Sequence, residues 1–279
     1  MKYIFFGTPS FAAIMLDRLL EAGRPPALIV CNPDRPVGKK KIITAPPTKI
    51  LAQRHALPVW QPERLTLAEA APKFAGNQFA VVATYAHVIK KEIIDLFPRG
   101  IVGIHFSLLP KYRGPSPVPS AILAGETEIA TTFSLMDEKL DHGPILLQEK
   151  TPIDPSETRT DLDRRLAFLS GQLLIDFLPR FVAGHVRPRE QDHASATYTK
   201  KFRAADGQVD LQKETPETIW RKIRALNPEP GVFTDRAGKR IKLLEASYFN
   251  HKLRLTKIQI AGKQPRAISE REQQALFEI

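Results

Sequence analysis

The first 31 residues have the pattern of a β-α-β unit, and this unit constrains the fold more than any other feature of the chain. Lys2–Phe6 is a short apolar strand, and Gly7-Thr8-Pro9 follows it. We expect Thr8 to cap a helix whose first residue is the proline, because that position needs no amide hydrogen. Apolar residues then recur at helical spacing, and Ala27–Cys31 is a second strand. Such a unit implies parallel strands joined by a right-handed crossover.

Later segments extend this predicted sheet. Phe79–Thr84 (FAVVAT) is continuously apolar and rich in β-branched residues, which is typical of a strand buried on both faces. Ile101–Ile104 is the next strand, and Ile129–Met136 with Ile145–Gln148 form a predicted antiparallel pair. Thr158–Phe181 has the apolar stripe of a long amphipathic helix. The pattern predicts an α/β fold with a Rossmann-like, mostly parallel sheet.

The motif content excludes several classes of function. A dinucleotide site needs G-x-G-x-x-G at the first turn, where this chain has Gly7 alone. No run of about 18 uncharged apolar residues is present, so we expect no transmembrane helix. Cys31 is the single cysteine, which excludes an internal disulfide and a Cys-rich zinc site and indicates a reducing cytoplasm. We expect no bound metal.

The composition changes near residue 184. The segment 184–204 is polar and patternless, so we predict a linker between a first domain, 1–183, and a second domain, 205–279. The second domain begins with a predicted helix, Pro216–Leu226, followed by short alternating segments that predict a small OB-like β-barrel: Lys239–Leu244, Ala246–Phe249 and Leu253–Ile260.

Positive charge is concentrated in two parts of the chain. The formal net charge is +11, and residues 200–279 hold 17 Lys and Arg against 10 Asp and Glu. The segment Asn32–Pro47 contains four cations against Asp34 alone: Arg35, Lys39, Lys40 and Lys41. We predict a structureless connection there, which is either a solvated surface loop or a mobile basic finger that closes on a phosphate backbone.

The stretch Gly103–Gly114 (GIHFSLLPKYRG) places His105 where a predicted strand ends. Ligands bind at the carboxyl ends of strands in open α/β sheets, so this histidine is a candidate site residue. The residues alone also allow a packed histidine, and Asp141 in the later segment DEKLDHG could be a simple turn residue. If the two side chains lie together, the carboxylate could stabilise the protonated imidazole. This imidazolium could then donate a hydrogen bond to a developing oxyanion.

Six blocks of sequence, in order, resemble those of the methionyl-tRNA formyltransferases along nearly the whole chain. The central block is shared more widely, with glycinamide ribonucleotide formyltransferases and sugar N-formyltransferases. The matching blocks are FFGTPSFA at Phe5–Ala12, NPDRPVGKKK at Asn32–Lys41, VVATYAHVI at Val81–Ile89, HFSLLPKYRGPSPVPSAILAGE at His105–Glu126, MDEKLDHGPIL at Met136–Leu146 and IRALNPEPG at Ile223–Gly231.

The resemblance implies transfer of a formyl group from 10-formyltetrahydrofolate to the α-amino group of methionyl-tRNA, in support of translation initiation. His105 and Asp141 would be the catalytic residues. Gly103 stands where the family motif N-x-H has an asparagine that is also directed at the formyl oxygen, and His142 stands where these enzymes often have threonine. The implied folate-binding residues are Val82, Thr84, Tyr85, Ser107, Leu108, Leu109, Pro110 and His142.

The resemblance also implies that methionyl initiator tRNA is a partner. The tRNA-contacting residues would be Arg35, Lys39, Lys40, Lys41, Lys200 and Lys201, and we expect a cytoplasmic monomer that does not bind membranes. Two alternatives stay open. The chain could formylate an amino-sugar nucleotide, or it could be a folate- or tRNA-binding homologue whose catalysis was impaired when the asparagine was lost at position 103.

Overall fold

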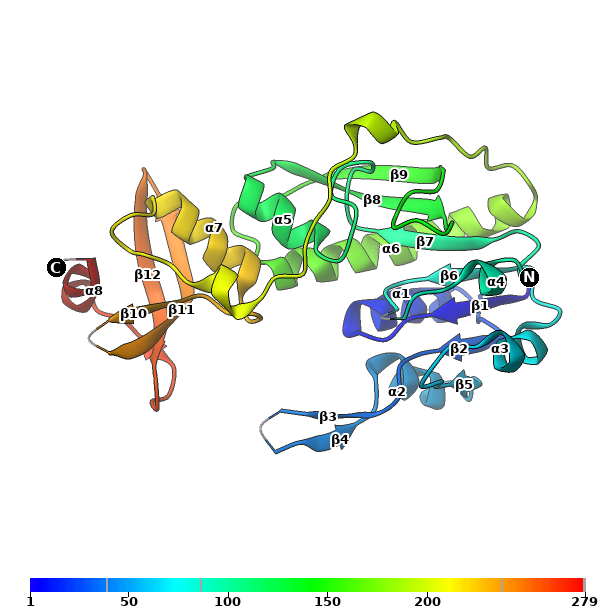
Figure 1. Cartoon of the computed structure of the whole chain (residues 1–279), viewed down its shortest axis with the longest axis horizontal. Helices are drawn as coiled ribbons and strands as arrows, with labels where there is room; N and C mark the ends of the chain where they lie inside the picture. The colour runs from blue at the N-terminus through cyan, green and yellow to red at the C-terminus, as the bar shows by residue number, and fades with distance from the viewer. Residues whose placement is uncertain (39, 86, 237, 278–279) are drawn as a thin grey trace. The chain divides into compact units, whose positions relative to one another are not determined.

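The computed structural model describes residues 1–38, 40–85, 87–236 and 238–277 (Figure 1). The chain forms two compact units, and each unit consists of three separate stretches of sequence. The first unit consists of Met1–Arg113, Ala130–Lys150 and Asp163–Thr197, and the second consists of Gly114–Ile129, Thr151–Leu162 and Tyr198–Ile279.

A seven-stranded sheet forms the centre of the first unit, with the order β5-β2-β1-β6-β7-β8-β9. The pairs β1–β2, β2–β5, β1–β6 and β6–β7 are parallel, and β8 runs antiparallel to β7. The mostly parallel sheet that the sequence predicts is confirmed. The strands are β1 (Tyr3–Phe6), β2 (Leu28–Val30), β5 (Val59–Trp60), β6 (Phe79–Val82), β7 (Ile101–His105), β8 (Glu128–Leu135) and β9 (Ile145–Pro152).

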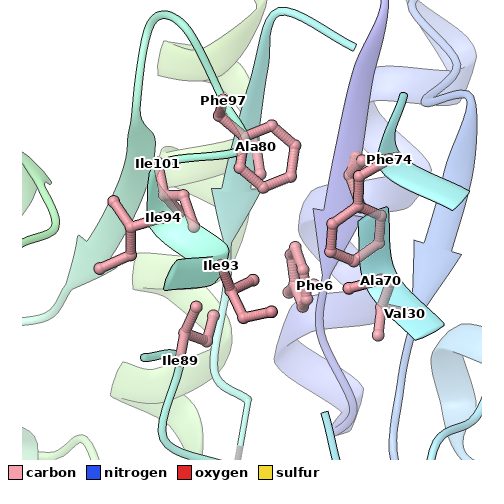
Figure 2. Packing of buried hydrophobic residues seen from close by; sticks show 11 residues of the cluster. Phe6, Val30, Ala70, Phe74, Ala80, Ile89, Ile93, Ile94, Phe97 and Ile101 are labelled. Carbon is pink, nitrogen blue, oxygen red and sulfur yellow. The ribbon is translucent and has the colours of Figure 1, made fainter. Parts of the chain in front are cut away.

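Apolar side chains cover both faces of this sheet, which explains why its central strands are continuously apolar. On one face, Phe74 contacts Phe6 and Phe97, with ring centroids 5.6 and 5.3 Å apart (Figure 2). On the other face, Phe181 packs edge-on against Phe79. The helices of this part of the chain are α1 (Ser10–Glu21), α2 (Pro47–Arg54), α3 (Leu67–Phe74), α4 (Lys91–Ile94) and α6 (Arg159–Val182), whereas α5 (Pro117–Ala124) belongs to the second unit.

The predicted cap at Thr8 is wrong. Helix α1 begins one residue later than expected, with Pro9 at the N-cap, and no side chain caps it. The Thr8 hydroxyl instead accepts a hydrogen bond from the Asn32 amide at 3.1 Å. It therefore ties the turn after β1 to the end of β2, and this long-range contact has no local sequence pattern.

The segment between β2 and α2 is not structureless, which corrects a second expectation. It forms a separate two-stranded hairpin of β3 (Arg35–Val37) and β4 (Ile42–Thr44), with Val37 opposite Ile42. The β-branched residues that pair are exposed, and both strands are edges, so a proline is tolerated within β3. The prolines and lysines of the segment concealed this pattern.

Asp34 anchors the base of the hairpin. Its carboxylate accepts hydrogen bonds from the Lys49 ammonium at 2.8 and 2.9 Å and from the Gln61 amide at 2.8 Å. The Lys49 contact, with that of Gln61, lowers the pKa of Asp34 below its usual value. A lowered pKa means that the anchor is intact above the usual aspartate range and is lost as the pH falls through the lowered value.

The second unit contains the predicted helix and a small antiparallel sheet. Thr215 caps α7 (Pro216–Leu226) by accepting a hydrogen bond from the Thr218 amide. The domain predicted as a small OB-like β-barrel is a C-terminal antiparallel β-domain, and two predicted strands are one strand, β11, with a register irregularity near Glu245. The sheet order is β10 (Phe233–Arg236), β11 (Lys239–Phe249), β12 (Lys252–Ile260) and β13 (Arg266–Ala267), and α8 (Glu270–Phe277) follows. No helix among the described residues has the length and apolar character needed to cross a membrane.

Candidate active site

His105 is the last residue of β7, and its side chain is largely buried. Its Nδ1 atom lies 3.7 Å from Oδ2 of Asp141, and its Nε2 atom lies 2.9 Å from the Tyr112 carbonyl oxygen. Because a carbonyl oxygen can only accept, Nε2 carries a hydrogen in this arrangement. Nδ1 then faces the carboxylate. The structure thus brings together the two residues that the sequence singled out.

The turn after β7 is held by a hydrogen bond within the turn and by two from the strands β8 and β9. The Ser107 hydroxyl donates to the Lys111 carbonyl at 2.6 Å, and the Thr132 hydroxyl donates to the Ser107 carbonyl at 2.6 Å. The Gln148 amide donates to the Leu109 carbonyl at 3.1 Å. The candidate folate residues Ser107, Leu108, Leu109 and Pro110 therefore lie in one well-supported turn next to His105.

The other candidate folate segment follows β6. Val82 is in register with Gly103 on β7, and Thr84 adopts a left-handed conformation with φ of 66°. The ring of Tyr85 turns into the core against Phe6, at a centroid distance of 5.4 Å. Burial, together with the nearby Cys31 thiol, raises the pKa of Tyr85 to about 12. Its side chain is thus part of the core, which leaves main-chain groups as the means by which this residue could contact a ligand.

Gly103 has no side chain, and Met136 partly fills the space beside it. The glycine has no left-handed φ, and a Cβ atom added to it would lie 3.2 Å from Cγ and 3.7 Å from Sδ of Met136. Positions 103 and 105 are two residues apart on one strand, so their side chains point to the same face. An asparagine here would therefore lie beside His105, provided that Met136 moves by a few tenths of an ångström.

The loop that carries Asp141 is tightly constrained. A Cβ atom at Gly143 would lie 1.9 Å from the Leu135 carbonyl oxygen, so the turn accommodates only glycine without moving. The ring of His142 stacks on His193 with centroids 4.0 Å apart, and its Nδ1 atom lies 2.6 Å from Oδ2 of Asp137. This neighbourhood places His142 near the site, but its expected contact with folate stays a prediction.

Three residues of this neighbourhood were not predicted as site residues. Gln191 and His193 lie in the segment interpreted as a linker, and Arg113 lay in a basic cluster whose burial the sequence did not indicate. Arg113 and Gln191 are 1% and 5% exposed. The segment is attached to the first unit by a β-bridge between Ile145 and Arg189. Neither hydrophobic periodicity nor a motif distinguishes Gln191 and His193 in the sequence, and nothing in the block His105–Glu126 indicates that its Arg113 is buried.

The candidate tRNA-contacting cations are mostly exposed. Lys40 and Lys41 lie between the two strands of the β3–β4 hairpin, while Lys39 lies outside the described residues. Arg35 forms an exposed ion pair with Glu63 at 2.5 Å. Lys200 forms an ion pair with Asp206, and Lys201 is exposed. Within the described part of the chain, no group of three or more His, Cys, Asp or Glu residues could hold a metal ion.

Comparison with known proteins identifies the family. The formyl transferase family model matches residues 1–178, and the model of the formyl transferase C-terminal domain matches residues 201–266. The methionyl-tRNA formyltransferase of Chloroflexus aurantiacus is 39% identical, over 88% of this chain and 80% of that protein. The methionyl-tRNA formyltransferase of Synechococcus sp. JA-3-3Ab is 40% identical, over 88% of this chain and 77% of that protein.

Solved structures share the fold at lower identity. The methionyl-tRNA formyltransferase of Clostridium thermocellum matches with a TM-score of 0.63 and 17% identity, over 93% of this chain and 98% of that one. An N-formyltransferase of Helicobacter canadensis, solved with folinic acid and dTDP-3-aminofucose, matches with a TM-score of 0.66 and 21% identity, over 90% and 88% of the two chains. From the family models and the relatives of about 40% identity, the chain belongs to the formyl transferase family, in the branch of the methionyl-tRNA formyltransferases.

Proposed function

We propose that His105 and Asp141 carry out the formyl transfer to methionyl-tRNA that membership of this family assigns to the chain. The observation that carries this proposal is their approach to 3.7 Å at the carboxyl end of β7, where ligands bind in sheets of this type. The enzyme class follows from the family, whereas the roles of individual residues are inferred from the geometry.

The formyl donor is a folate, and we propose 10-formyltetrahydrofolate. The supporting observation is the arrangement of main chain around His105. The left-handed turn at Thr84, the turn Ser107–Pro110 and the loop at Asp141 are each held in place by the fold. We propose that the pterin is recognised by main-chain groups of these segments, and that Val82, Leu108 and His142 complete its surroundings.

During transfer, the methionyl amine forms a bond to the formyl carbon and the bond from that carbon to the folate nitrogen breaks. The formyl oxygen gains negative charge while both bonds are present. We propose that His105 donates a hydrogen bond to this oxygen through the Nδ1–H that faces Asp141. The imidazole then gives that proton to the leaving folate nitrogen and takes up the proton that the attacking amine loses. Much of the acceleration would come from positioning the two substrates.

We propose that the basic hairpin and the basic second domain contact the phosphates of initiator tRNA. Replacing Lys40 and Lys41 together with alanine should weaken methionyl-tRNA binding at low salt and lower the slope of log K against log salt by about two. Both side chains are exposed, so the thermal unfolding temperature should stay unchanged. Binding titrations at several salt concentrations test this, with the exposed pair Lys90 and Lys91, which follow β6, as a charge-matched control. An unchanged slope would exclude these lysines as phosphate contacts.

Two details of organisation are proposals as well. The matched ranges 1–178 and 201–266 support domain boundaries at 1–183 and 205–279 with an intervening linker. We further propose that the protein acts as a cytoplasmic monomer. Sedimentation of the purified chain and fractionation of cells test these two statements.

Incubation of the protein with 10-formyltetrahydrofolate and methionyl-tRNA tests the function directly. We expect formylmethionyl-tRNA to form, and no formyl transfer to a dTDP-amino sugar supplied in place of the tRNA. Transfer to the sugar nucleotide instead would support the amino-sugar alternative, whose solved representative shares only the fold with this chain. Binding of folate and tRNA without any turnover would support the impaired homologue that Gly103 allows.

A further inference from the structure

The contact between His105 and Asp141 is too long to fix the geometry of the pair by itself. Charge-assisted N–H···O hydrogen bonds are about 2.7–2.9 Å long, whereas these atoms are 3.7 Å apart. Asp141 also adopts a left-handed conformation, with φ of 48°, which is uncommon for residues other than glycine. Hydrogen bonds to the main chain of this loop therefore contribute to the position of its carboxylate.

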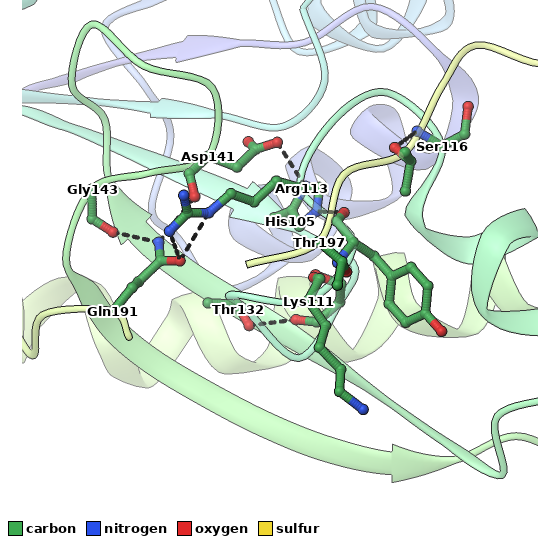
Figure 3. A network of polar contacts seen from close by, with 12 residues as sticks. His105, Lys111, Arg113, Ser116, Thr132, Asp141, Gly143, Gln191 and Thr197 are labelled. Carbon is green, nitrogen blue, oxygen red and sulfur yellow. Dashed lines mark hydrogen bonds and ion pairs between the residues drawn. The ribbon is translucent and has the colours of Figure 1, made fainter. Parts of the chain in front are cut away.

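Gln191 supplies such contacts (Figure 3). Its Nε2 atom donates one hydrogen bond to the Asp141 carbonyl at 2.9 Å and a second to the Gly143 carbonyl at 2.7 Å. The two hydrogen bonds hold the loop on both sides of His142. Because Gln191 is 5% exposed, water competes little for these carbonyl oxygens.

Arg113 fixes the orientation of the Gln191 amide. The Oε1 atom of Gln191 accepts hydrogen bonds from Nη2 of Arg113 at 2.7 Å and from Nε at 3.2 Å. A guanidinium can only donate, so the amide oxygen must face the arginine and the amide nitrogen must face the loop. Nη2 of the arginine also donates to Nδ1 of His193 at 2.9 Å. Because the arginine is almost completely buried, the Gln191 amide keeps this one orientation.

The segment Tyr112–Arg113 also holds His105, the other member of the catalytic pair. The Tyr112 carbonyl accepts the hydrogen bond from Nε2 of His105, and the Tyr112 amide donates to the Thr197 hydroxyl at 2.8 Å. The Arg113 amide donates to the Thr197 carbonyl, also at 2.8 Å. Residues 112 and 113 thus contact the imidazole directly and the carboxylate loop through Gln191.

We propose that Gln191, oriented by Arg113, is a positioning residue that sets the separation between the Asp141 carboxylate and the His105 imidazole. Gln191 touches neither the imidazole nor the carboxylate and acts through the Asp141 and Gly143 carbonyls. The inference rests on the proposed roles of His105 and Asp141. It assigns a part in catalysis to a segment that the sequence predicted to be a linker and that the structure places in the first unit.

The variant Gln191→Glu tests the proposal with little change in size. Its carboxylate can still accept from Arg113, but an oxygen replaces the amide nitrogen opposite the two loop carbonyls. We expect kcat to fall about 10- to 100-fold, since small displacements of catalytic groups are costly. KM for 10-formyltetrahydrofolate and for methionyl-tRNA should stay within about threefold. The matched control is Gln78→Glu, at an exposed position before β6, which should keep wild-type kcat.

A double-mutant cycle with Asp141→Asn separates positioning from general stability. If Gln191 works through the Asp141 carboxylate, adding Gln191→Glu to Asp141→Asn should cost less than about threefold in kcat. Losses that multiply in full, or a Gln191→Glu variant with wild-type kcat, would overturn the proposal. Should Gln191→Glu fail to fold, Gln191→Met removes the same donors without adding a charge and is subject to the same cycle.

Amide hydrogen exchange provides a readout that does not depend on turnover. Exchange across residues 137–143 should be faster in Gln191→Glu than in the wild type, while exchange in β6 should be the same. Unchanged exchange in the loop would overturn the proposed clamp even in an active enzyme. If the wild type transfers no formyl group, the proposed function fails, and the exchange experiment still decides whether Gln191 holds the loop.

Discussion

Replacing His105 with alanine should lower kcat for formyl transfer by about 10²- to 10³-fold, the usual cost of removing one oxyanion donor. His105 is the last residue of β7, and its Nδ1 atom lies 3.7 Å from the Asp141 carboxylate. The loss should appear in kcat more than in KM, because the charge that the imidazole stabilises develops during the reaction. Asp141→Asn should give a smaller loss in the same direction. Steady-state kinetics with methionyl-tRNA measure both effects.

The matched control is His55→Ala, at an exposed position that follows α2. It makes the same chemical change and should leave kcat at the wild-type value. Circular dichroism and thermal unfolding show whether His105→Ala keeps its fold, since this residue also donates a hydrogen bond to Tyr112. If folded His105→Ala retained wild-type kcat, the proposed catalytic role of the histidine would be wrong.

Gly103→Asn should raise kcat by about 10- to 100-fold. A restored oxyanion donor would normally be worth about 10²- to 10³-fold, and part of this gain is expected to be lost in displacing Met136. The backbone at position 103 suits any residue, and the contact in the way is the flexible side chain of that methionine. The same kinetic assay measures the gain, and it should again appear in kcat.

Gly103→Ala separates the amide from the added bulk. The alanine introduces the same Cβ atom beside Met136 without a hydrogen-bond donor, so it should give no increase in kcat. If steric crowding hides the gain in Gly103→Asn, adding Met136→Ala creates the missing space. A folded Gly103→Asn that is no faster than the wild type in either background would show that this chain stabilises the oxyanion without a donor at position 103.

The sequence predicts the sheet because local patterns and burial coincide there. The β-α-β unit at the N-terminus and the continuously apolar run at Phe79 each require a parallel sheet covered on both faces, and the structure has one. His105 could be located for the same reason, since a polar residue that ends an apolar strand must lie at the edge of the sheet. The residues alone raised its pairing with Asp141 as one possibility, and the resemblance to a family made that pairing a prediction.

Three expectations about local structure failed, the first because a long-range contact overrides local propensity. Thr8 can cap a helix, but in the fold its hydroxyl accepts a hydrogen bond from the Asn32 amide instead. In the hairpin at Arg35–Thr44, Val37 pairs with Ile42 on the β-branched strand β4, and the prolines and lysines of the segment conceal this pairing in the sequence. In β11, one strand bends through an irregularity instead of ending.

By itself, the sequence determined the class of fold, the strand that ends at His105 and the family to which the motifs belong. The tertiary structure alone decided that Arg113 and Gln191 are buried and that they hold the Asp141 loop. The physical reason is that these contacts join residues 48 to 78 positions apart. Contacts between residues so far apart leave no periodic pattern in the sequence. The role of each polar residue therefore depends on which hydrogen-bond donors and acceptors the fold places next to it.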